Sequence, residues 1–179
     1  MVVMTMKKII LPLNKEIIKS LRAGEDVLLS GKIYTARDAA HKRLYESIQK
    51  KESLPIILKG GIIYYCGPAP AKPGYAIGPC GPTTSKRMDK FTPALLSKGL
   101  AAMIGKGSRS EEVITAIKRY KAVYFAAIGG AAAYLSTRVK KARVVSYKML
   151  GPEAIYELTV EDFPVVVAID SRGKSIFSV

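Results

Sequence analysis

Apolar positions along the chain follow two different periods, and the order in which these periods change predicts the fold. Residues 27–35, VLLSGKIYT, alternate between apolar and polar side chains as a half-buried strand does. Residues 60–67, GGIIYYCG, are typical of a short buried strand. The segment between them has helical spacing, and its apolar side carries Ala39, Ala40, Leu44 and Ile48. A strand, a helix and a second strand therefore follow one another.

The start of this first helix carries a capping pattern. Thr35 and Asp38 stand three positions apart, with aspartate in place of the usual glutamate, so we expect Thr35 to cap the helix. A second amphipathic helix is predicted over residues 110–121, where Ser110 is the cap and two glutamates suit the first turn. Residues 86–100 between the two helices have helical spacing that Pro93 interrupts.

The second half of the chain is predicted to be rich in strands. Residues 101–105 form a short apolar piece, and residues 121–128 form a buried strand that runs into a turn of small residues. Near the end, Asp170 to Gly173 are predicted to be a turn between two antiparallel strands. Alternating strands and helices with this terminal hairpin predict an α/β fold, in which helices flank a layered mixed sheet.

Length and composition favour one domain over residues 1–179. A chain of 179 residues with 49% hydrophobic content can bury one substantial core. Apolar runs stay below the length of a membrane span: the longest candidate, residues 122–135, has 14 residues and contains a Gly-Gly pair. The first residues place lysines after apolar positions, which does not follow the order of a secretory signal. We therefore expect a cytoplasmic protein that does not enter a membrane.

The cysteines argue against a metal centre built by this chain alone. Cys66 and Cys80 are the two cysteines, and one histidine accompanies them, so a zinc or iron–sulfur ligand set is not expected here. We predict that both are reduced structural thiols.

The net charge of +15 indicates an anionic partner. Lysine and arginine number 29 against 14 acidic residues, and such an excess attracts polyanions. The basic residues are spread along the whole chain, however, and most aromatic residues lie in apolar runs, where core packing explains them better than base stacking. Nucleic acid is therefore the less favoured hypothesis, and an acidic partner protein or a small anionic substrate fits the same charge.

Three motifs place cations near predicted helix starts. In TARDAAHKR, residues 35–43, Arg37 lies in the first turn and His41 follows four residues later on the same face. An arginine at this end opposes the helix dipole, so stability alone does not explain it. Beside free N–H groups, its guanidinium suits a carboxylate. A surface arginine with an incidental histidine is the alternative.

The second motif, GPTTSKRMD, covers residues 81–89. Thr83 and Thr84 supply hydroxyl and N–H groups at the start of a predicted helix, and Arg87 lies one turn further on. These groups suit a small anion, and an ordinary helix cap is the alternative.

The third motif, GKGSRS, covers residues 105–110. It fails as a phosphate-binding P-loop, because Gly99 and Gly105 are separated by five residues where four are needed, and Lys106 is followed by glycine. The segment is instead predicted to be a loop that presents Lys106 and Arg109 to an anion. The residues alone thus predict a binder of small carboxylates.

Six motifs together resemble a known family. In order, they are TARDAAHKR, YYCGPAPAKPG, GPTTSKRMD, GKGSRS, AAIGGAAA and EAIYELTVEDFPVVVAIDSRG, and they extend over roughly residues 20–179. Their order and spacing are similar to those of the beta subunit, or C-terminal domain, of class I fumarate hydratase and of the related tartrate dehydratase. The resemblance implies a swivelling β/β/α domain.

The family resemblance also implies a shared active site. A separate alpha subunit or N-terminal domain would carry a four-iron four-sulfur cluster, and none would bind to this chain alone. A small dicarboxylate would be the substrate, and the assembly would be a homodimer or a heterotetramer. The implied activity is a hydro-lyase reaction that interconverts malate and fumarate, a step of the tricarboxylic acid cycle.

Site residues follow from the same resemblance. Arg37, Arg87 and Lys106 match residues that clamp the dicarboxylate, with Thr84 beside them. Thr83 matches a threonine proposed as the base that removes the carbon-bound proton, with help from Arg37, and His41 is kept as the alternative base.

Four positions depart from the family pattern as we expect it. Cys66 and Cys80 stand where small residues are expected, Lys86 adds a charge inside the threonine motif, and Ser108 replaces an asparagine. The sequence therefore leaves three hypotheses open: a fumarate hydratase, a tartrate dehydratase, or a basic nucleic-acid-binding domain.

Overall fold

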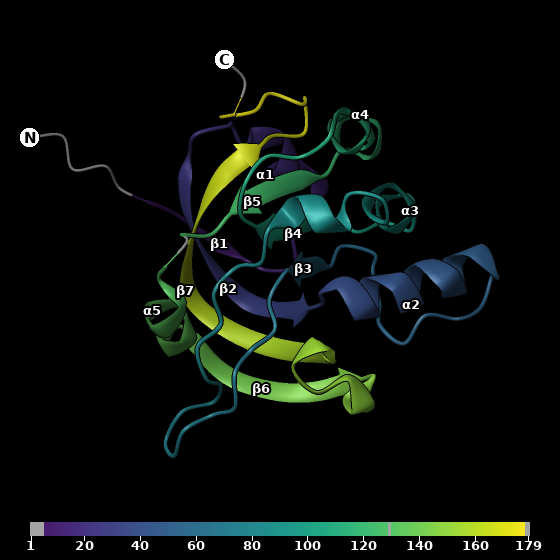
Figure 1. Cartoon of the computed structure of the whole chain (residues 1–179). Helices are drawn as coiled ribbons and strands as arrows, with labels where there is room; N and C mark the ends of the chain where they lie inside the picture. Colours follow the sequence, from purple (N-terminus) through teal and green to yellow (C-terminus); the bar gives the residue numbers. More distant parts are fainter. Residues whose placement is uncertain (1–5, 129, 178–179) are drawn as a thin grey trace, which may run out of the picture.

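A mixed sheet forms the centre of the molecule (Figure 1). The structure is a computed structural model, and it describes residues 6–128 and 130–177. Within these residues, seven strands pair in one sheet in the order β1 (Lys7–Ile10), β2 (Asp26–Thr35), β3 (Ile62–Tyr64), β4 (Ala102–Gly105), β5 (Val123–Ala126), β7 (Ile155–Ile169) and β6 (Val139–Ser146). The α/β fold predicted from the sequence is confirmed.

The long strand β7 closes part of this sheet into a ring. Strands β1 to β5 are parallel neighbours, whereas β7 runs antiparallel to β5, β6 and β2. Its pairing with β2 extends from Asp26↔Val166 to Thr35↔Tyr156. Pairing therefore returns from β7 to β2, and β2, β3, β4, β5 and β7 form a closed circuit.

Side chains that alternate along the short strands fill two cores. Ile62 and Tyr64 point into the core inside the ring, and Ile63 and Tyr65 point into the core beneath the helices. Three helices cover the second core and lie together on one side of β3 and β4 in Figure 1: α2 (Asp38–Gln49), α3 (Thr92–Ser97) and α4 (Glu111–Tyr120). Two further helices are α1 (Lys15–Ser20) and α5 (Ala132–Thr137). Two short 3₁₀ segments, η1 (Ser85–Met88) and η2 (Lys148–Glu153), complete the elements.

The predicted helix starts had different outcomes. Ser110 is the N-cap of α4, and its side chain accepts a hydrogen bond from the amide of Val113, as predicted. The cap predicted at Thr35 is wrong. Thr35 is the last residue of β2, its hydroxyl accepts a hydrogen bond from the amide of Tyr156 at 3.2 Å, and Arg37 occupies the N-cap position without a side-chain capping bond. Pairing of β2 with β7 holds Thr35 in the sheet.

Two predicted features of the second half need correction. The small residues after β5 lead into helix α5, which the predicted turn did not include; Gly129 lies outside the described residues. The turn at Asp170 to Gly173 is present, but up to residue 177 the strand predicted after it is reduced to a single bridge between Ile169 and Ser175, and residues 178–179 lie outside the described residues. β7 instead uses β2 and β6 as its long antiparallel partners. None of the helices within residues 6–128 and 130–177 has the length and hydrophobicity of a membrane-spanning segment.

Candidate functional site

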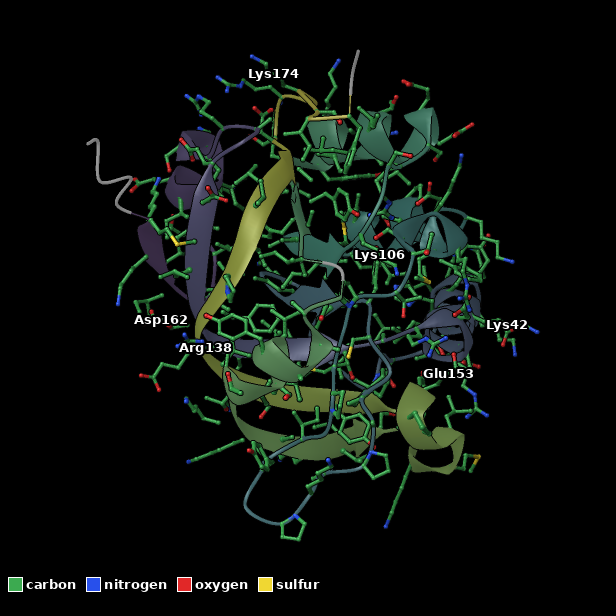
Figure 2. The ribbon with its side chains drawn as sticks, turned by 60° about the vertical axis from the view of Figure 1, so that its left-hand side comes forward. Lys42, Lys106, Arg138, Glu153, Asp162 and Lys174 are labelled. Atoms are coloured by element: carbon green, nitrogen blue, oxygen red, sulfur yellow. The ribbon has the colours of Figure 1, made fainter. Side chains whose placement is uncertain are left out.

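The three sequence motifs meet at one edge of the parallel strands. β2, β3 and β4 are neighbours, and their carboxyl ends lie at the same edge. Arg37 comes two residues after β2, and Lys106, labelled in Figure 2, follows β4 directly. The amide of Thr83 donates to the carbonyl of Tyr65 at 2.6 Å, so the chain returns to the end of β3 after the Pro/Gly loop. A parallel bridge then joins Thr84 to Lys106.

Asp38 connects the first two motifs. Arg87 donates to both oxygens of the Asp38 carboxylate, from Nε at 3.0 Å and from Nη2 at 2.7 Å. The Nε atom of Arg37 lies 3.9 Å from the same carboxylate. Two arginines that are fifty residues apart are thus brought to one acidic group. Sequence reasoning assigned Asp38 to helix capping, although its position next to Arg37 was a signal for an ion pair.

Arg37 lies partly buried against the backbone after β3. Its Nε atom is buried and has no hydrogen-bond partner among the described residues. A Cβ atom at Gly67 would come within 2.9 Å of its Cδ and Nη1 atoms. The glycine in YYCG therefore makes room for the guanidinium of Arg37, a role that the sequence did not reveal.

His41 is completely buried beneath this arginine. Its Nδ1 atom lies 2.8 Å from the carbonyl oxygen of Arg37, and its ring meets the ring of Tyr65 edge-on at 5.1 Å. Because a carbonyl only accepts, Nδ1 carries the proton. The Nε2 atom is buried and has no hydrogen-bond partner among the described residues. Burial lowers the pKa of His41 to about 4, so the ring is neutral at pH 7.

The two threonines lie in front of η1, which is a single short 3₁₀ segment where the sequence predicted the start of a longer helix. Thr84 occupies its N-cap position without a side-chain capping bond. Thr84 is exposed and Thr83 is half-buried. The alternative interpretation of these threonines as an ordinary helix cap is therefore less well supported than their availability to an anion. Pro93 lies in the first turn of the next helix, α3, as the interrupted pattern indicated.

Lys106 is exposed, but its main chain is fixed. Its amide donates to the hydroxyl of Ser85 at 3.0 Å, and its carbonyl accepts from the amide of Ser85 at 3.0 Å. A Cβ atom at Gly105 would overlap Ser85 Oγ, so only glycine fits at this end of β4. The lysine side chain is thus presented from a defined backbone.

Arg109 differs from the prediction. It is buried, with Nε donating to Asp89 at 2.7 Å and Nη2 donating to the hydroxyl of Thr92 at 2.9 Å, so it does not present a charge to an external anion. Its guanidinium also lies over the rings of Tyr65 and Tyr124, 5.2 Å and 4.8 Å from the ring centres. Arg109 is a core residue of the loop that carries Lys106.

The cysteines are buried and free, as predicted. A hydrogen bond with Cys80 and burial both raise the pKa of the Cys66 thiol. Within residues 6–128 and 130–177, no group of three or more histidine, cysteine or acidic side chains could hold a metal ion. The described side chains therefore do not fit the ligand set of an iron–sulfur cluster.

Comparison with known proteins identifies the family to which this α/β fold, with basic side chains at one sheet edge, belongs. The family model described as the C-terminus of fumarase matches residues 2–179, and the chain belongs to that family. An aerobic class I fumarate hydratase from Salmonella typhimurium is 42% identical over 151 residues, which cover 83% of this chain and 26% of that protein. Fumarate hydratase 2 from Leishmania major is 38% identical over 157 residues, which cover 87% of this chain and 28% of that protein.

A further relative has nearly the same length as this chain. The protein named "Putative L(+)-tartrate dehydratase subunit beta" from Methanocaldococcus jannaschii is 41% identical over 171 residues, which cover 92% of this chain and 88% of that protein. By contrast, the chain spans about a quarter of the length of the fumarate hydratases that it matches. The expected family is confirmed, and two substrates occur among the names of its members.

Proposed function

We propose that this chain is the beta subunit of a class I fumarate hydratase and contributes half of an active site that hydrates fumarate to malate reversibly. The observation that supports this function best is the meeting of Arg37, Arg87, Lys106 and two threonines at the carboxyl edge of β2, β3 and β4. Basic side chains and free hydroxyl groups at such an edge suit a small dianion. The fumarate hydratases among its relatives supply the reaction.

The cations have separate roles in this proposal. Lys106 and Arg87 are exposed and bind carboxylates of the substrate directly. Arg37 lies deeper, in the space left by Gly67, and its side chain is 27% exposed, so the exposed part of the side chain can face the substrate. Thr84 contributes its hydroxyl beside Lys106. Because Arg87 keeps half of its side chain exposed while paired with Asp38, a substrate carboxylate can reach it.

Thr83 is the better candidate for the base. In the direction from malate to fumarate, its Oγ atom would take the carbon-bound proton, and nearby guanidinium charge would stabilise the alkoxide that does so. His41 lies in the first turn of α2 and is completely buried, with no hydrogen-bond partner for Nε2 among the described residues, which supports the threonine over the histidine. We assign it to holding the carbonyl of Arg37.

The four-iron four-sulfur cluster belongs to the alpha subunit in this proposal. The described side chains of this chain do not provide its ligands. When bound in the partner, the cluster would supply a Lewis acid for the hydroxyl group that leaves or adds. The present chain would bind and orient the dicarboxylate and move its proton.

An apolar hollow near Thr83 suits the partner subunit. It lies between the Pro/Gly loop and α5, and Tyr75, Ile77 and Tyr134 line it. The carbonyl of Ala132 in α5 accepts a hydrogen bond from the amide of Cys80, which places this hollow close to the threonine motif. Exposed aromatic side chains of this kind are common at subunit interfaces. A homodimer or heterotetramer built through this face would complete the site.

A tartrate dehydratase beta subunit is the second candidate, because the relative from Methanocaldococcus jannaschii has nearly the same length as this chain. A nucleic-acid-binding domain remains the third, on charge alone. These candidates predict different results in solution. The enzyme predicts activity with a dicarboxylate, and the binding domain predicts a salt-dependent affinity for RNA or DNA.

The deciding experiment is fumarate hydration followed anaerobically by absorbance. The purified chain is assayed alone and after mixing with its candidate iron–sulfur subunit. We expect activity only in the mixture. No turnover of fumarate in a mixture with an intact cluster would refute the fumarate assignment, and L-tartrate would then be assayed in the same mixture.

The identity of the base is tested separately. Thr83→Ala and His41→Ala are compared by exchange of solvent deuterium into the substrate carbon. We expect Thr83→Ala to lose the exchange while it still binds substrate. Loss of exchange only in His41→Ala would assign the base to the histidine instead.

A further inference from the structure

The hydroxyl groups of Ser85 and Tyr124 form a hydrogen-bond chain around the main chain of Lys106. Tyr124 Oη lies 2.9 Å from Ser85 Oγ and 2.8 Å from the carbonyl oxygen of Gly107. The amide of Lys106 donates to Ser85 Oγ at 3.0 Å. A carbonyl only accepts, so Tyr124 gives its single proton to Gly107 and accepts a hydrogen bond from Ser85. The chain therefore runs in one direction, from the Lys106 amide through two hydroxyl groups to the Gly107 carbonyl.

This arrangement fixes Lys106 from both sides. The carbonyl of Lys106 also accepts from the amide of Ser85, so the serine binds both the N–H and the C=O group of the lysine. The absence of a side chain at Gly105 leaves the space that Ser85 occupies. On the outer side, residues 106–108 are exposed and depend on these contacts for a defined path.

Arg109 holds the ring of Tyr124 in place. The guanidinium lies over the ring, 4.8 Å from its centre, and is itself bonded to Asp89 at 2.7 Å. The second oxygen of Asp89 accepts from the amide of Ser110 at 2.7 Å. The far end of the loop is thus anchored to the segment that carries Ser85 and Arg87.

Neither hydroxyl group can touch a substrate. Ser85 and Tyr124 are both completely buried, whereas the lysine that they surround is exposed. Burial raises the pKa of Tyr124 to about 12, so the phenol keeps the proton that it donates to Gly107 at pH 7. Two buried polar groups in a fully satisfied chain restrict the backbone next to them.

We propose that Ser85 and Tyr124 are positioning residues of the dicarboxylate site, which set the direction in which the Lys106 ammonium group meets a carboxylate. The proposal rests on the function proposed above. Without the tyrosine hydroxyl, the Gly107 carbonyl and Ser85 each lose a partner, and the lysine starts from a less defined backbone. Weakening one such hydrogen bond corresponds to a change of roughly threefold to tenfold in KM.

The first test needs no enzyme activity. Amide hydrogen exchange at Lys106 is measured in the full chain for the wild type, Tyr124→Phe and Ser85→Ala. Tyr64→Phe is the matched control, because it also loses a buried phenol hydroxyl, one that donates to the carbonyl of Cys80 and not to the residues around Lys106. We expect exchange to accelerate at least about fivefold in Tyr124→Phe, more in Ser85→Ala, and not in the control. Unchanged exchange in both test variants would overturn the proposal.

The second test is a double-mutant cycle in the assembled enzyme. Tyr124→Phe is expected to raise KM roughly threefold to tenfold with kcat changed less than about twofold, and this effect should disappear in a Lys106→Ala background. Tyr64→Phe should show no such coupling to Lys106. Equal effects of Tyr124→Phe in both backgrounds would overturn the positioning role, because the tyrosine would then act independently of the lysine.

The two proposals can fail separately. A wild-type mixture that turns over neither fumarate nor tartrate with an intact cluster refutes the proposed function, and it refutes a positioning role in catalysis as well. If the wild type is active but the effects of Tyr124→Phe and Lys106→Ala on KM simply add, only the positioning role is refuted. In either case, amide hydrogen exchange at Lys106 tests whether the hydrogen-bond chain restrains its backbone.

Discussion

Arg109 and Arg87 each pair with an aspartate, and their surroundings give the two pairs different tasks. Arg109 and Asp89 meet at 2.7 Å with side chains that are 0% and 9% exposed. Arg87 and Asp38 also meet at 2.7 Å, but their side chains are 52% and 35% exposed. The same contact is therefore structural in the first case and open to exchange with a ligand in the second.

Burial explains the difference. A charge in the interior depends on its partner, because the energy of removing it from water must be offset there. An exposed pair contributes little to stability, because water solvates both groups when they separate. Under the proposed function, the second pair releases Arg87 to a substrate carboxylate at small energetic cost, while the first keeps the loop of Lys106 attached to the segment of Arg87.

The largest expected effect comes from breaking the buried pair. Arg109→Met leaves Asp89 as an unpaired charge in the interior and should lower the free energy of unfolding by about 3–5 kcal/mol. Urea denaturation measures it. Arg119→Met is the matched control, since Arg119 also lies over a tyrosine ring but is exposed, and it should change stability by about 0.5 kcal/mol or less. A loss below about 1 kcal/mol in Arg109→Met would contradict the structural role.

The buried side of the site should also make stability depend on pH. The pKa of His41 is lowered from 6.5 to about 4 in the folded chain, so the unfolded chain binds more protons between these values. Stability from this group is complete above pH 6.5 and is lost as pH falls toward 4, by up to about 3 kcal/mol. Burial lowers this pKa most and Arg109 lowers it further, and together they outweigh the hydrogen bond to the Arg37 carbonyl and the Asp38 charge, which raise it.

The measurement for His41 is a difference between two stability curves. Urea denaturation of the wild type and of His41→Gln is compared between pH 4 and pH 7, because carboxylates titrate in both proteins and cancel in the difference. We expect the wild type to lose more stability on acidification. Parallel curves would show that His41 titrates normally in the folded chain.

The sequence identified the three cation-bearing motifs that meet at this edge, but not the bonds between them. Motifs that follow β2, β3 and β4 had to meet at one edge once the strands were known to be parallel, and Arg37, Arg87 and Lys106 meet there. Local patterns also identified Ser110 as a cap. The prediction that Arg109 faces an external anion is wrong, because a loop arginine looks the same in sequence whether solvent or a buried aspartate faces it.

Long-range packing accounts for the other differences. The 15-residue strand β7 pairs with β2 over most of its length and keeps Thr35 in the sheet, so its long partner is β2 and not the segment after the turn at Asp170. The roles of Gly67 and Gly105 depend on atoms of Arg37 and Ser85 that approach from distant segments. No local pattern in the chain contains these contacts, whereas period and capping are local properties.

Breaking the exposed pair of Arg87 and Asp38 should weaken substrate binding while leaving the free energy of unfolding almost unchanged. Arg87→Ala is expected to change the free energy of unfolding by less than about 1 kcal/mol, while KM for the dicarboxylate rises by a factor of ten or more or turnover is lost in the assembled enzyme. Lys86→Ala is the matched control, an exposed neighbour outside the ion pair, and it should have little effect on KM. Unchanged kinetics in Arg87→Ala would remove this arginine from the site.

The smallest effect is expected when the same pair is broken from the acidic side. Asp38→Asn keeps the shape of the side chain but removes the charge that orients both nitrogen atoms of Arg87. Because Arg87 itself remains, we expect KM to rise only about threefold and stability to change by less than about 1 kcal/mol. Steady-state kinetics of the assembled enzyme at low and high salt measures the change. A fall in KM would instead show that the Asp38 carboxylate competes with the substrate for Arg87, and the exposed pair would then act as a gate for the anion.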